Sequence, residues 1–219
     1  MIRHVIWDWN GTLLDDVDHA LSALNLLLEA RAMPRLDRER YREHFGFPVR
    51  DFYEHLGFDF AREDFATVSE SFIAHYKRAA ETAQIHTEVR STMSALATAG
   101  IAQSVLSAME LTMLREMLQK HALDQHLTHI RGLDHLHATS KVALGVELMN
   151  TLGTPASETL FVGDTLHDLE TANAMGCQCL LFVHGHQTKA RLSAGGGQLI
   201  HTLSEVVDLV RTHAAASRK

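Results

Sequence analysis

The chain has 219 residues, 46% of them hydrophobic, and a formal net charge of −7 at pH 7. This length and composition suffice to bury a sizeable core in one or two compact units. The acidic balance leaves no basic excess that would attract nucleic acid or an anionic membrane surface, so neither partner is expected, although a small anion could bind locally.

The two cysteines, Cys177 and Cys179, are one residue apart on a predicted strand, where their side chains would point to the same face. This geometry is too constrained for a sound disulfide, and we expect a reducing, cytoplasmic location. The apolar N-terminal stretch is interrupted by Asp8 and Asn10, and no apolar run approaches membrane-spanning length. We therefore expect neither a signal peptide nor a transmembrane helix.

A short buried strand is predicted at residues 4–9, which are rich in Val, Ile and Trp and run into an Asn-Gly turn. A helical pattern follows as far as about residue 81. Apolar residues recur at helical spacing over residues 17–28 and 65–76, which predicts two long amphipathic helices. Proline and glycine breaks divide the stretch between them into shorter pieces.

The pattern changes from residue 88 onward, where short apolar runs alternate with helix-length periodic stretches. This alternation is typical of an α/β fold with a parallel sheet and crossover helices on both faces. The first strand would then belong to the later sheet, and the helical block would be inserted between its first and second strands. The predicted later strands are residues 102–107, 127–130, 159–163, 177–183 and 198–200.

Polar side chains end several of the predicted strands, and in an open parallel sheet functional groups gather beyond these carboxyl ends. Asp8 ends the first strand, Ser107 the second, and Asp164 the strand in "FVGDTLHD". Asp168 follows four residues later at the start of a helix, and Lys141 begins the helix that precedes this strand. Three carboxylates so close together would repel one another without a counter-charge, and a divalent cation would supply it.

The expected cation is Mg²⁺. Oxygen ligands alone select a hard cation. The small number of carboxylates leaves room for water and for a substrate phosphate, which favours Mg²⁺ over an all-protein calcium cage.

Four stretches together resemble the motifs of the haloacid dehalogenase (HAD) superfamily, in its phosphoglycolate phosphatase-like branch: "DWNGTLL", "VLSA", Lys141 and "FVGDTLHDLETANAMGC". The resemblance covers nearly the whole chain. It implies a Rossmann-like parallel-sheet core over residues 1–15 and 82–219, with a helical cap inserted at residues 16–81. It also implies a Mg²⁺-dependent phosphatase that acts on a small phosphorylated metabolite through an aspartyl-phosphate intermediate. We expect a monomer or homodimer.

The resemblance assigns Asp8 as the nucleophile and places the phosphoryl group against Ser107 and Lys141. A carboxylate that attacks phosphorus replaces one difficult hydrolysis by two easier steps. Thr12 and backbone N–H groups near Gly11 are expected to donate to the phosphoryl oxygens, and Gly11 would let the backbone come close.

The metal ligands implied by the resemblance are Asp8, the backbone carbonyl of Asn10, and Asp164. Asp168 completes the candidate metal set, where it would support the ion through water or through the ligands.

The amide at position 10 departs from the family pattern, which has Asp two residues after the nucleophile as general acid and base. Asn10 keeps its main-chain carbonyl, so the metal site should survive, but its side chain cannot carry the proton. Such proton transfer contributes about 10²–10⁴ in rate, which corresponds to about 3–5 kcal/mol of barrier. Asp8 and Asn10 are therefore the two positions on which catalysis is expected to depend.

Four explanations of Asn10 stay open. The first is a slower phosphatase, which either prefers leaving groups that need little protonation (acyl, pyrophosphate or aryl phosphates) or relays the proton through Asp16 or His19. The second is a catalytically weak relative that binds a phosphate ligand and signals. The third is a different HAD reaction, on a haloacid or a phosphonate. The fourth is deamidation of Asn10 to Asp.

The rival reactions meet objections from the sequence. Haloacid dehalogenases need no metal, whereas Asp164 and Asp168 indicate one. Phosphonate hydrolases of the superfamily form a Schiff base with a cap lysine, and Lys77, the only lysine between residues 16 and 81, lies downstream of the expected position. A receiver domain also uses a phosphorylatable Asp, but it lacks a helical insertion.

The cap is expected to close over the site, exclude water and contact the rest of the substrate. An arginine that faces a carboxylate or a second phosphate would suit an acidic metabolite. The candidate contacts are His44, Phe45, Arg50 and Tyr53 from the cap, and His167, His184 and His186 near the mouth of the site.

Overall fold

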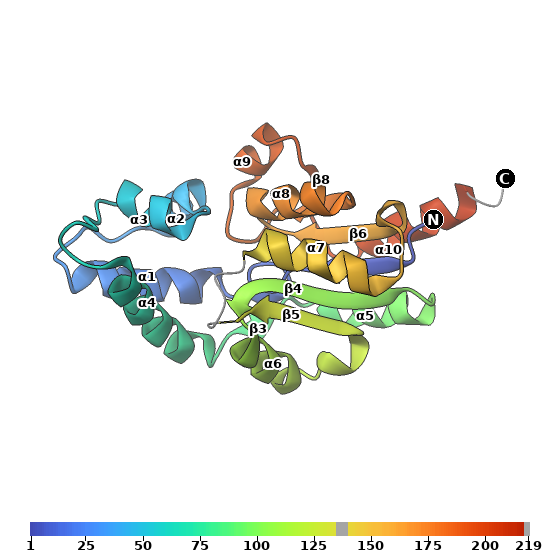
Figure 1. Cartoon of the computed structure of the whole chain (residues 1–219), viewed down its shortest axis with the longest axis horizontal. Coiled ribbons are helices and arrows are strands. Elements are labelled where there is room, and N and C mark those ends of the chain that lie inside the picture. The colour runs from blue at the N-terminus through green and yellow to red at the C-terminus, as the bar shows by residue number, and fades with distance from the viewer. Residues whose placement is uncertain (135–139, 217–219) are drawn as a thin grey trace.

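The computed structural model describes residues 1–134 and 140–216 of the chain. Figure 1 shows a central sheet with helices on both faces and, beyond one end of the sheet, a group of four further helices. None of the helices in the described ranges is long and apolar enough to cross a membrane.

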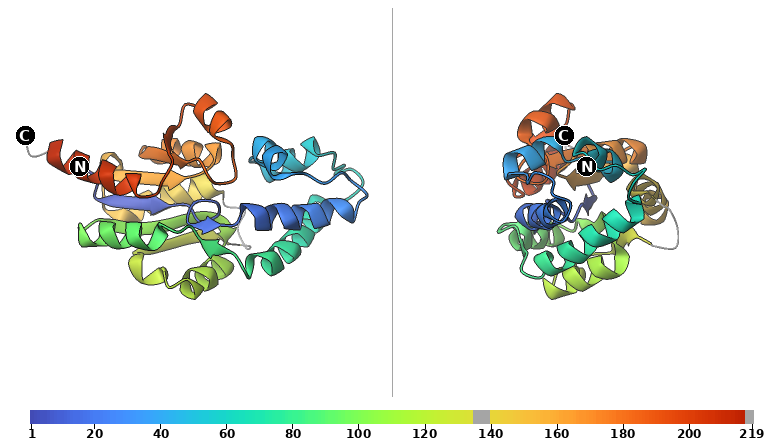
Figure 2. Two further views of the ribbon diagram at one scale, coloured as in Figure 1. Left: turned by 180° about the vertical axis from the view of Figure 1, so that it is seen from behind. Right: turned by 90° about the vertical axis from the view of Figure 1, so that its left-hand side faces the viewer.

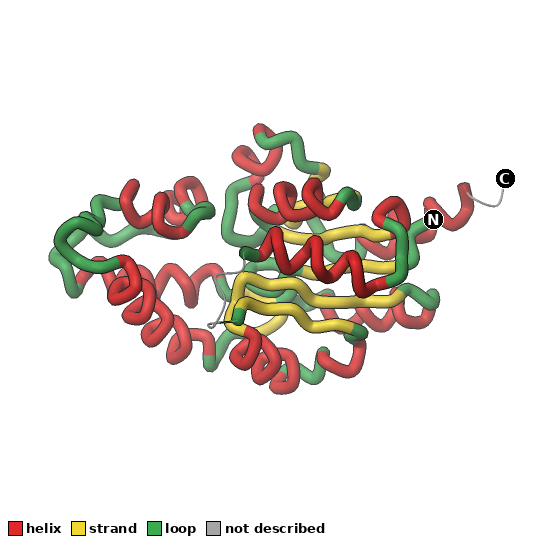
Figure 3. Tube along the Cα trace, in the orientation of Figure 1, coloured by secondary structure: helices red, strands yellow, loops and turns green. Residues whose placement is uncertain are grey.

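The central sheet, drawn in yellow in Figure 3, has six strands, and the pairing of each with its neighbours is parallel. The first strand lies in the middle of the sheet and is buried along its whole length. This confirms the predicted α/β fold and the prediction that the first strand joins the later sheet. The strand order is β5 (His129–Leu133), β4 (Ala102–Glu110), β1 (His4–Trp7), β6 (Thr159–Gly163), β7 (Gln178–Phe182) and β8 (Gln198–Ile200).

Successive side chains of β1 enter two different cores because side chains alternate between the faces of a strand. Ile6 packs with α7 (Lys141–Leu152) and α8 (Leu166–Met175) on one face. Val5 and Trp7 belong to the core on the other face, which α5 (Val89–Thr98) and α10 (Glu205–Ala216) cover, as Figure 2 shows from behind. A strand buried on both faces needs the unbroken apolar run that the sequence provides here.

The bounds of four strands differ from those predicted, and the smallest difference is in β7, which spans residues 178–182 rather than 177–183. β1 ends at Trp7 because the chain turns after Asp8, where the Trp9 carbonyl accepts bonds from three following N–H groups. β4 continues past Ser107 to Glu110 through an irregularity in its pairing with β5. β5 begins at residue 129, after a short 3₁₀ turn, rather than at residue 127.

The helical group is joined to the core through a small antiparallel ribbon of β2 (Leu14–Asp15) and β3 (Gln84–Ile85). The two predicted long helices are present and pack against each other (Figure 1). Two shorter helices lie between them, and α6 (Leu111–Lys120) and α9 (Lys189–Ala194) belong to the sheet region. The four helices of the group are α1 (Val17–Glu29), α2 (Arg38–His44), α3 (Val49–His55) and α4 (Phe65–Ala80).

Two residues of α7 allow a matched test of the core on one face of the sheet. Leu148 is fully buried, whereas Val146 is 41% exposed on the same helix. We expect Leu148→Ala to lower the free energy of unfolding by about 2–5 kcal/mol, since it removes methyl groups and leaves a cavity. Val146→Ala should change it by less than about 0.5 kcal/mol. Urea denaturation of both variants measures the difference, and equal effects would contradict this placement of α7.

Candidate active site

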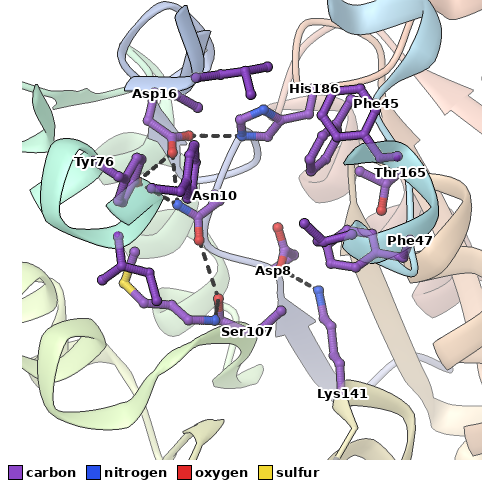
Figure 4. Close-up of a pocket in the computed structure, with 18 of the residues that line it drawn as sticks. Asp8, Asn10, Asp16, Phe45, Phe47, Tyr76, Ser107, Lys141, Thr165 and His186 are labelled. Carbon is purple, nitrogen blue, oxygen red and sulfur yellow. Dashed lines mark hydrogen bonds and ion pairs between the residues drawn. The ribbon is translucent and has the colours of Figure 1, made fainter. Parts of the chain in front are cut away.

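The predicted site residues meet at the carboxyl end of the sheet, under the four-helix group (Figure 4). Asp8 follows β1, Ser107 lies in β4, Asp164 follows β6, Lys141 begins α7, and Asp168 lies in the first turn of α8. All five side chains are buried. One carboxylate oxygen from each of Asp8, Asp164 and Asp168 lies within 4.8 Å of the others. The residues predicted from the strand ends, which come from distant parts of the chain, therefore lie close together in the structure.

Lys141 lies between two of the acids, and its ammonium group donates to the carboxylates of both Asp8 and Asp168. Burial disfavours the charged lysine, but these two carboxylates outweigh it and raise the pKa of Lys141. Burial raises the pKa of Asp8 well above its usual range, and the charges of Asp168 and Asp164 add to this against the attraction of Lys141. One ammonium group thus contacts two of the three carboxyl groups, and the set would carry an excess of negative charge if all three were ionised.

Asp168 has both of its carboxylate oxygens occupied. Oδ1 accepts from Lys141, and Oδ2 accepts from the backbone N–H groups of Asp164 (3.1 Å) and Thr165 (2.9 Å) and from the Thr165 hydroxyl (2.7 Å). Although burial opposes ionisation, Lys141 and the Thr165 donors lower the pKa of Asp168. A Cβ atom on Gly163 would lie 2.3 Å from Asp168 Cγ, so only glycine fits there. Asp168 caps α8 and fixes Lys141.

Asp164 is enclosed by backbone that comes unusually close. Its carboxylate accepts from the His186 N–H and from the Thr12 hydroxyl at 3.1 Å. Cβ atoms on Gly11 and Gly185 would lie 2.4 and 2.2 Å from Asp164 Oδ2. Burial raises the pKa of Asp164 to about 6. Thr12 was expected to donate to a phosphoryl group, but here its hydroxyl orients Asp164.

Asn10 binds a second buried acid, Asp16 (Figure 4). The Asn10 amide donates to Asp16 Oδ2 at 2.8 Å, and the Tyr76 hydroxyl donates to the same oxygen at 2.6 Å. Asp16 Oδ1 accepts from the Gly11 N–H at 2.8 Å and lies 3.2 Å from His186 Nε2. A carboxylate at position 10 would face this anion directly. The amide is therefore the side chain that fits beside Asp16.

His186 connects the two acidic groups. Its N–H binds Asp164, its ring Nε2 faces Asp16, and its Nδ1 lies 2.9 Å from the Tyr41 hydroxyl. Burial works against a charged imidazole, but Asp16 and Asp164 raise the pKa of His186 to about 9. Although burial also opposes a charged Asp16, His186, Tyr76 and Asn10 lower the pKa of that carboxyl.

A cavity of about 270 Å³ opens between the sheet end and the helical group. The acids, Asn10, Ser107, Lys141 and His186 line one side. The opposite side is mostly aromatic and aliphatic, with contributions from Leu24, Phe45, Phe52, Tyr53, Phe72 and Ile73.

Comparison with known proteins places the chain in one family. A family described as haloacid dehalogenase-like hydrolase matches residues 5–182. The chain belongs to this HAD-like hydrolase family. A phosphoglycolate phosphatase of Photorhabdus laumondii is 24% identical over 225 residues, which cover 100% of this chain and 95% of the relative. A phosphoglycolate phosphatase of Chromobacterium violaceum is also 24% identical, over 96% and 97% of the two chains.

The same family appears among solved structures. A haloacid dehalogenase-like hydrolase of Streptococcus pneumoniae superposes with a TM-score of 0.84 at 18% identity, and the match covers 95% of this chain and 98% of the other. The resemblance seen in the four sequence motifs is confirmed.

The candidate cap contacts of this HAD-like hydrolase divide into two groups. Phe45 and Tyr53 line the cavity. Of the other two, His44 packs against His55 in a tilted arrangement with ring centroids 4.7 Å apart, and the exposed Arg50 pairs with Glu54 at 3.1 Å. Neither is among the described lining residues. The short helices α2 and α3 turn their aromatic faces inward, which leaves these polar side chains outside.

Two of the three candidate histidines near the mouth, His167 and His184, also lie outside the described lining of the cavity, whereas His186 is part of it. His167 stacks on Phe47 with ring centroids 4.6 Å apart, and the ring of His184 packs against Phe182 at 5.3 Å. His19, the alternative proton relay, lies against the Thr82 hydroxyl at 3.3 Å. Of these groups, only Asp16 and His186 reach the site.

Arg42, which the sequence analysis did not single out, fastens the helical group to the core. Its guanidinium donates to the carbonyls of Gly185 (2.7 Å), Val183 (2.7 Å) and Gln187 (2.9 Å). The Gln187 amide returns a bond to the Phe45 carbonyl at 2.9 Å. No sequence signal marks Arg42 among the other arginines of this helix, because its partners lie about 140 residues away.

We expect Arg42→Met to lower the free energy of unfolding by about 2 kcal/mol, since hydrogen bonds to charged groups contribute about 1.5–3 kcal/mol each and this group is partly exposed. Arg38→Met on the same helix is the control, because Arg38 forms an exposed ion pair with Asp18 that should contribute less than about 1 kcal/mol. Urea denaturation compares the two. A loss no larger in Arg42→Met than in Arg38→Met would show that Arg42 does not hold the two parts together.

Proposed function

We propose that the protein is a Mg²⁺-dependent phosphatase that acts on a small phosphorylated metabolite through an aspartyl phosphate on Asp8. The observation that carries the proposal is the group of three buried carboxylates with oxygens within 4.8 Å, two of them held by Lys141. The phosphoglycolate phosphatase relatives support the same reaction class. We further propose residues 16–81 as a separate cap domain.

The residues present fit a hard divalent cation. Asp8 and Asp164 offer carboxylate oxygens, Asn10 offers a main-chain carbonyl, and such donors suit Mg²⁺. Burial favours the neutral forms of both acids, and a cation would reverse this preference. Bound Mg²⁺ would neutralise charge on the phosphoryl oxygens. Asp168 is assigned a supporting part, because both of its oxygens already have donors.

In the proposed reaction an oxygen of Asp8 attacks phosphorus and the bond to the leaving oxygen breaks. Lys141, which already contacts Asp8, carries positive charge toward the equatorial oxygens. The Ser107 oxygen accepts the Met109 N–H at 3.0 Å, and its hydroxyl donates over 3.5 Å to Asn10 Oδ1, a long contact that a phosphoryl oxygen would replace. Water then hydrolyses the aspartyl phosphate.

The proton for the leaving oxygen is the unusual part of this site. Asn10 carries none, and Asp16 is held as a carboxylate by four donors. His19 lies against Thr82, outside the described lining, and both ring nitrogens of His186 are engaged, one with Asp16 and the other with Tyr41. These contacts favour the first explanation of Asn10, an attenuated phosphatase whose leaving groups need little protonation.

Exchange of the side chains at positions 10 and 16 tests whether the site lacks a proton donor for the leaving oxygen. Asn10→Asp alone would place two carboxylates about as close as the present 2.8 Å hydrogen bond, so we expect little gain from it. Asn10→Asp combined with Asp16→Asn keeps the charge constant and should raise kcat for an alkyl phosphate by at least about 10-fold, since it restores a proton donor. Asp8→Asn should abolish turnover.

The measurement is Mg²⁺-dependent release of phosphate, with Asp16→Asn alone as the control for the exchange. A double variant no faster than the native protein would argue against the missing proton donor. Native protein without turnover but with phosphate-ligand binding would support the signalling alternative.

Mg²⁺ binding itself is testable without activity. Mg²⁺ at 100 times its dissociation constant should stabilise the native state by about 2.7 kcal/mol, a rise in Tm of about 5–10 °C for a chain of this size. Asp164→Asn should remove most of this rise because it deletes a proposed ligand, whereas Asp208→Asn, at an exposed position on α10, should retain it. Thermal melts with Mg²⁺ and with EDTA decide the point, and an equal rise in both variants would place the ion elsewhere.

A phosphonate hydrolase is a second candidate, favoured by one observation. Lys77 lies among the residues that line the cavity, although it is exposed. Borohydride trapping of Lys77 with phosphonoacetaldehyde would support this reaction over phosphate ester hydrolysis.

A further inference from the structure

The part of the cavity that faces away from the carboxylates is built from hydrocarbon. Phe45, Phe52 and Phe72 contribute rings, and Leu24 and Ile73 contribute aliphatic side chains. With the phosphoryl group placed at Asp8, this apolar wall is the surface that the leaving group would contact.

Two tyrosines add to the apolar wall because their hydroxyl groups are engaged elsewhere. The Tyr41 hydroxyl lies 2.9 Å from His186 Nδ1, and the Tyr76 hydroxyl donates to Asp16 at 2.6 Å. Both residues line the cavity. Aromatic rings pack favourably on other rings in stacked or edge-to-face arrangements, with about 0.5–1.5 kcal/mol beyond the area they bury.

The positively charged groups that line the cavity are poorly placed to bind an acidic leaving group. Among the described lining residues, Lys141 is paired with Asp8 and Asp168, and His186 faces Asp16. Lys77 also lines the cavity, but it is exposed to solvent, where water weakens its attraction for an anion, and no arginine is among the described lining residues. A carboxylate against these rings would lose its hydration without gaining a partner, which is costly.

The missing proton donor restricts the leaving group in a second, independent way. A phenol ionises with a pKa of about 10, as tyrosine does, whereas water, a guide to simple hydroxyl groups, has a pKa of about 15.7. A phenol therefore leaves as its anion far more readily than an alkyl alcohol. With an amide at position 10, a phenol can therefore leave without a proton donor, whereas the loss of an alkyl alcohol is slow.

We infer that the substrates are aryl phosphates, monoesters of a phenol-like hydroxyl on a single aromatic ring. The inference rests on the proposed phosphatase function and adds its substrate class. The cavity of about 270 Å³ lies near the lower end of the range of about 300–1,000 Å³ for small-molecule sites, which suits one ring.

The proposed step balances without a protein acid. An Asp8 oxygen bonds to phosphorus, the bond from phosphorus to the aryl oxygen breaks, and the electron pair leaves on the phenolate. The phenolate takes its proton from solvent. Water then attacks the same phosphorus, which regenerates the Asp8 carboxylate and releases inorganic phosphate, and the proton lost by water returns to solvent.

Four phosphates, tested with the full-length protein and Mg²⁺, separate the requirement for an aromatic ring from the requirement for an activated leaving group. Phenyl phosphate is aromatic and activated, benzyl phosphate is aromatic only, acetyl phosphate is activated only, and phosphoglycolate is neither. We expect kcat/KM for phenyl phosphate to exceed that for phosphoglycolate at least 100-fold, and its KM to be at least tenfold below that of acetyl phosphate. Benzyl phosphate should inhibit competitively, with a kcat at least 100-fold below that of phenyl phosphate.

A variant pair tests the apolar wall. Ile73 is 40% exposed at the cavity, so Ile73→Glu should fold, and we expect it to raise KM for phenyl phosphate at least tenfold. Leu26→Glu is the matched control, since Leu26 is 46% exposed on α1 and is absent from the described cavity lining. It should leave KM unchanged.

The outcomes distinguish the inference from the function beneath it. Phosphate release from none of the four compounds, or release that persists in Asp8→Asn, would overturn the phosphatase proposal. Release that depends on Asp8 but favours phosphoglycolate, or a KM for phenyl phosphate that Ile73→Glu does not move, would overturn only the aryl specificity. Equal kcat for benzyl and phenyl phosphate would overturn it as well.

Discussion

The buried negative charge at the carboxyl end of the sheet is the constraint on which the rest of this site depends. Two carboxylates with oxygens within 4.8 Å repel by about 3 kcal/mol at an effective dielectric constant of about 20. Lys141 relieves this for Asp8 and Asp168, and the helix cap relieves it further for Asp168. Asp164 accepts hydrogen bonds from neutral donors, and the positive charge of the His186 ring offsets part of its charge. Protonation or a bound cation must supply the rest.

A second charged assembly lies beside the first and explains the amide at position 10. Asp16 and His186 form a buried ion pair, and Asn10 donates to the anion of that pair. The chain therefore carries its second acid at position 16 rather than at position 10. His186 also binds Asp164 through its backbone, so the two assemblies share a residue, and a change in one should move the other.

The sequence predicted those parts of the molecule that local pattern and topology determine. Asp8 and Asp164 were found because they end apolar runs, and the parallel sheet brings such ends to one edge. The contacts of the helical group were harder to predict, because Tyr76 contacts Asp16 across 60 residues of sequence and Arg42 contacts Val183 across 141. Periodicity tells which face of a helix is apolar, but not which neighbour that face will cover. His44, Arg50 and the hydroxyl of Thr12 were assigned without that information.

Arg42 fastens the helical group to the core beside the site, and the surroundings of the buried groups affect both halves of the proposed reaction. Lys141 is buried, and the low local dielectric constant around it strengthens its attraction for developing negative charge. The second half of the reaction consumes a water molecule. The Asn10 amide cannot remove a proton from that water, just as it cannot donate a proton to a leaving group. If Asp8 carries the phosphoryl group as proposed, an activated leaving group relieves only the first half-reaction, and hydrolysis of the aspartyl phosphate becomes the slower half.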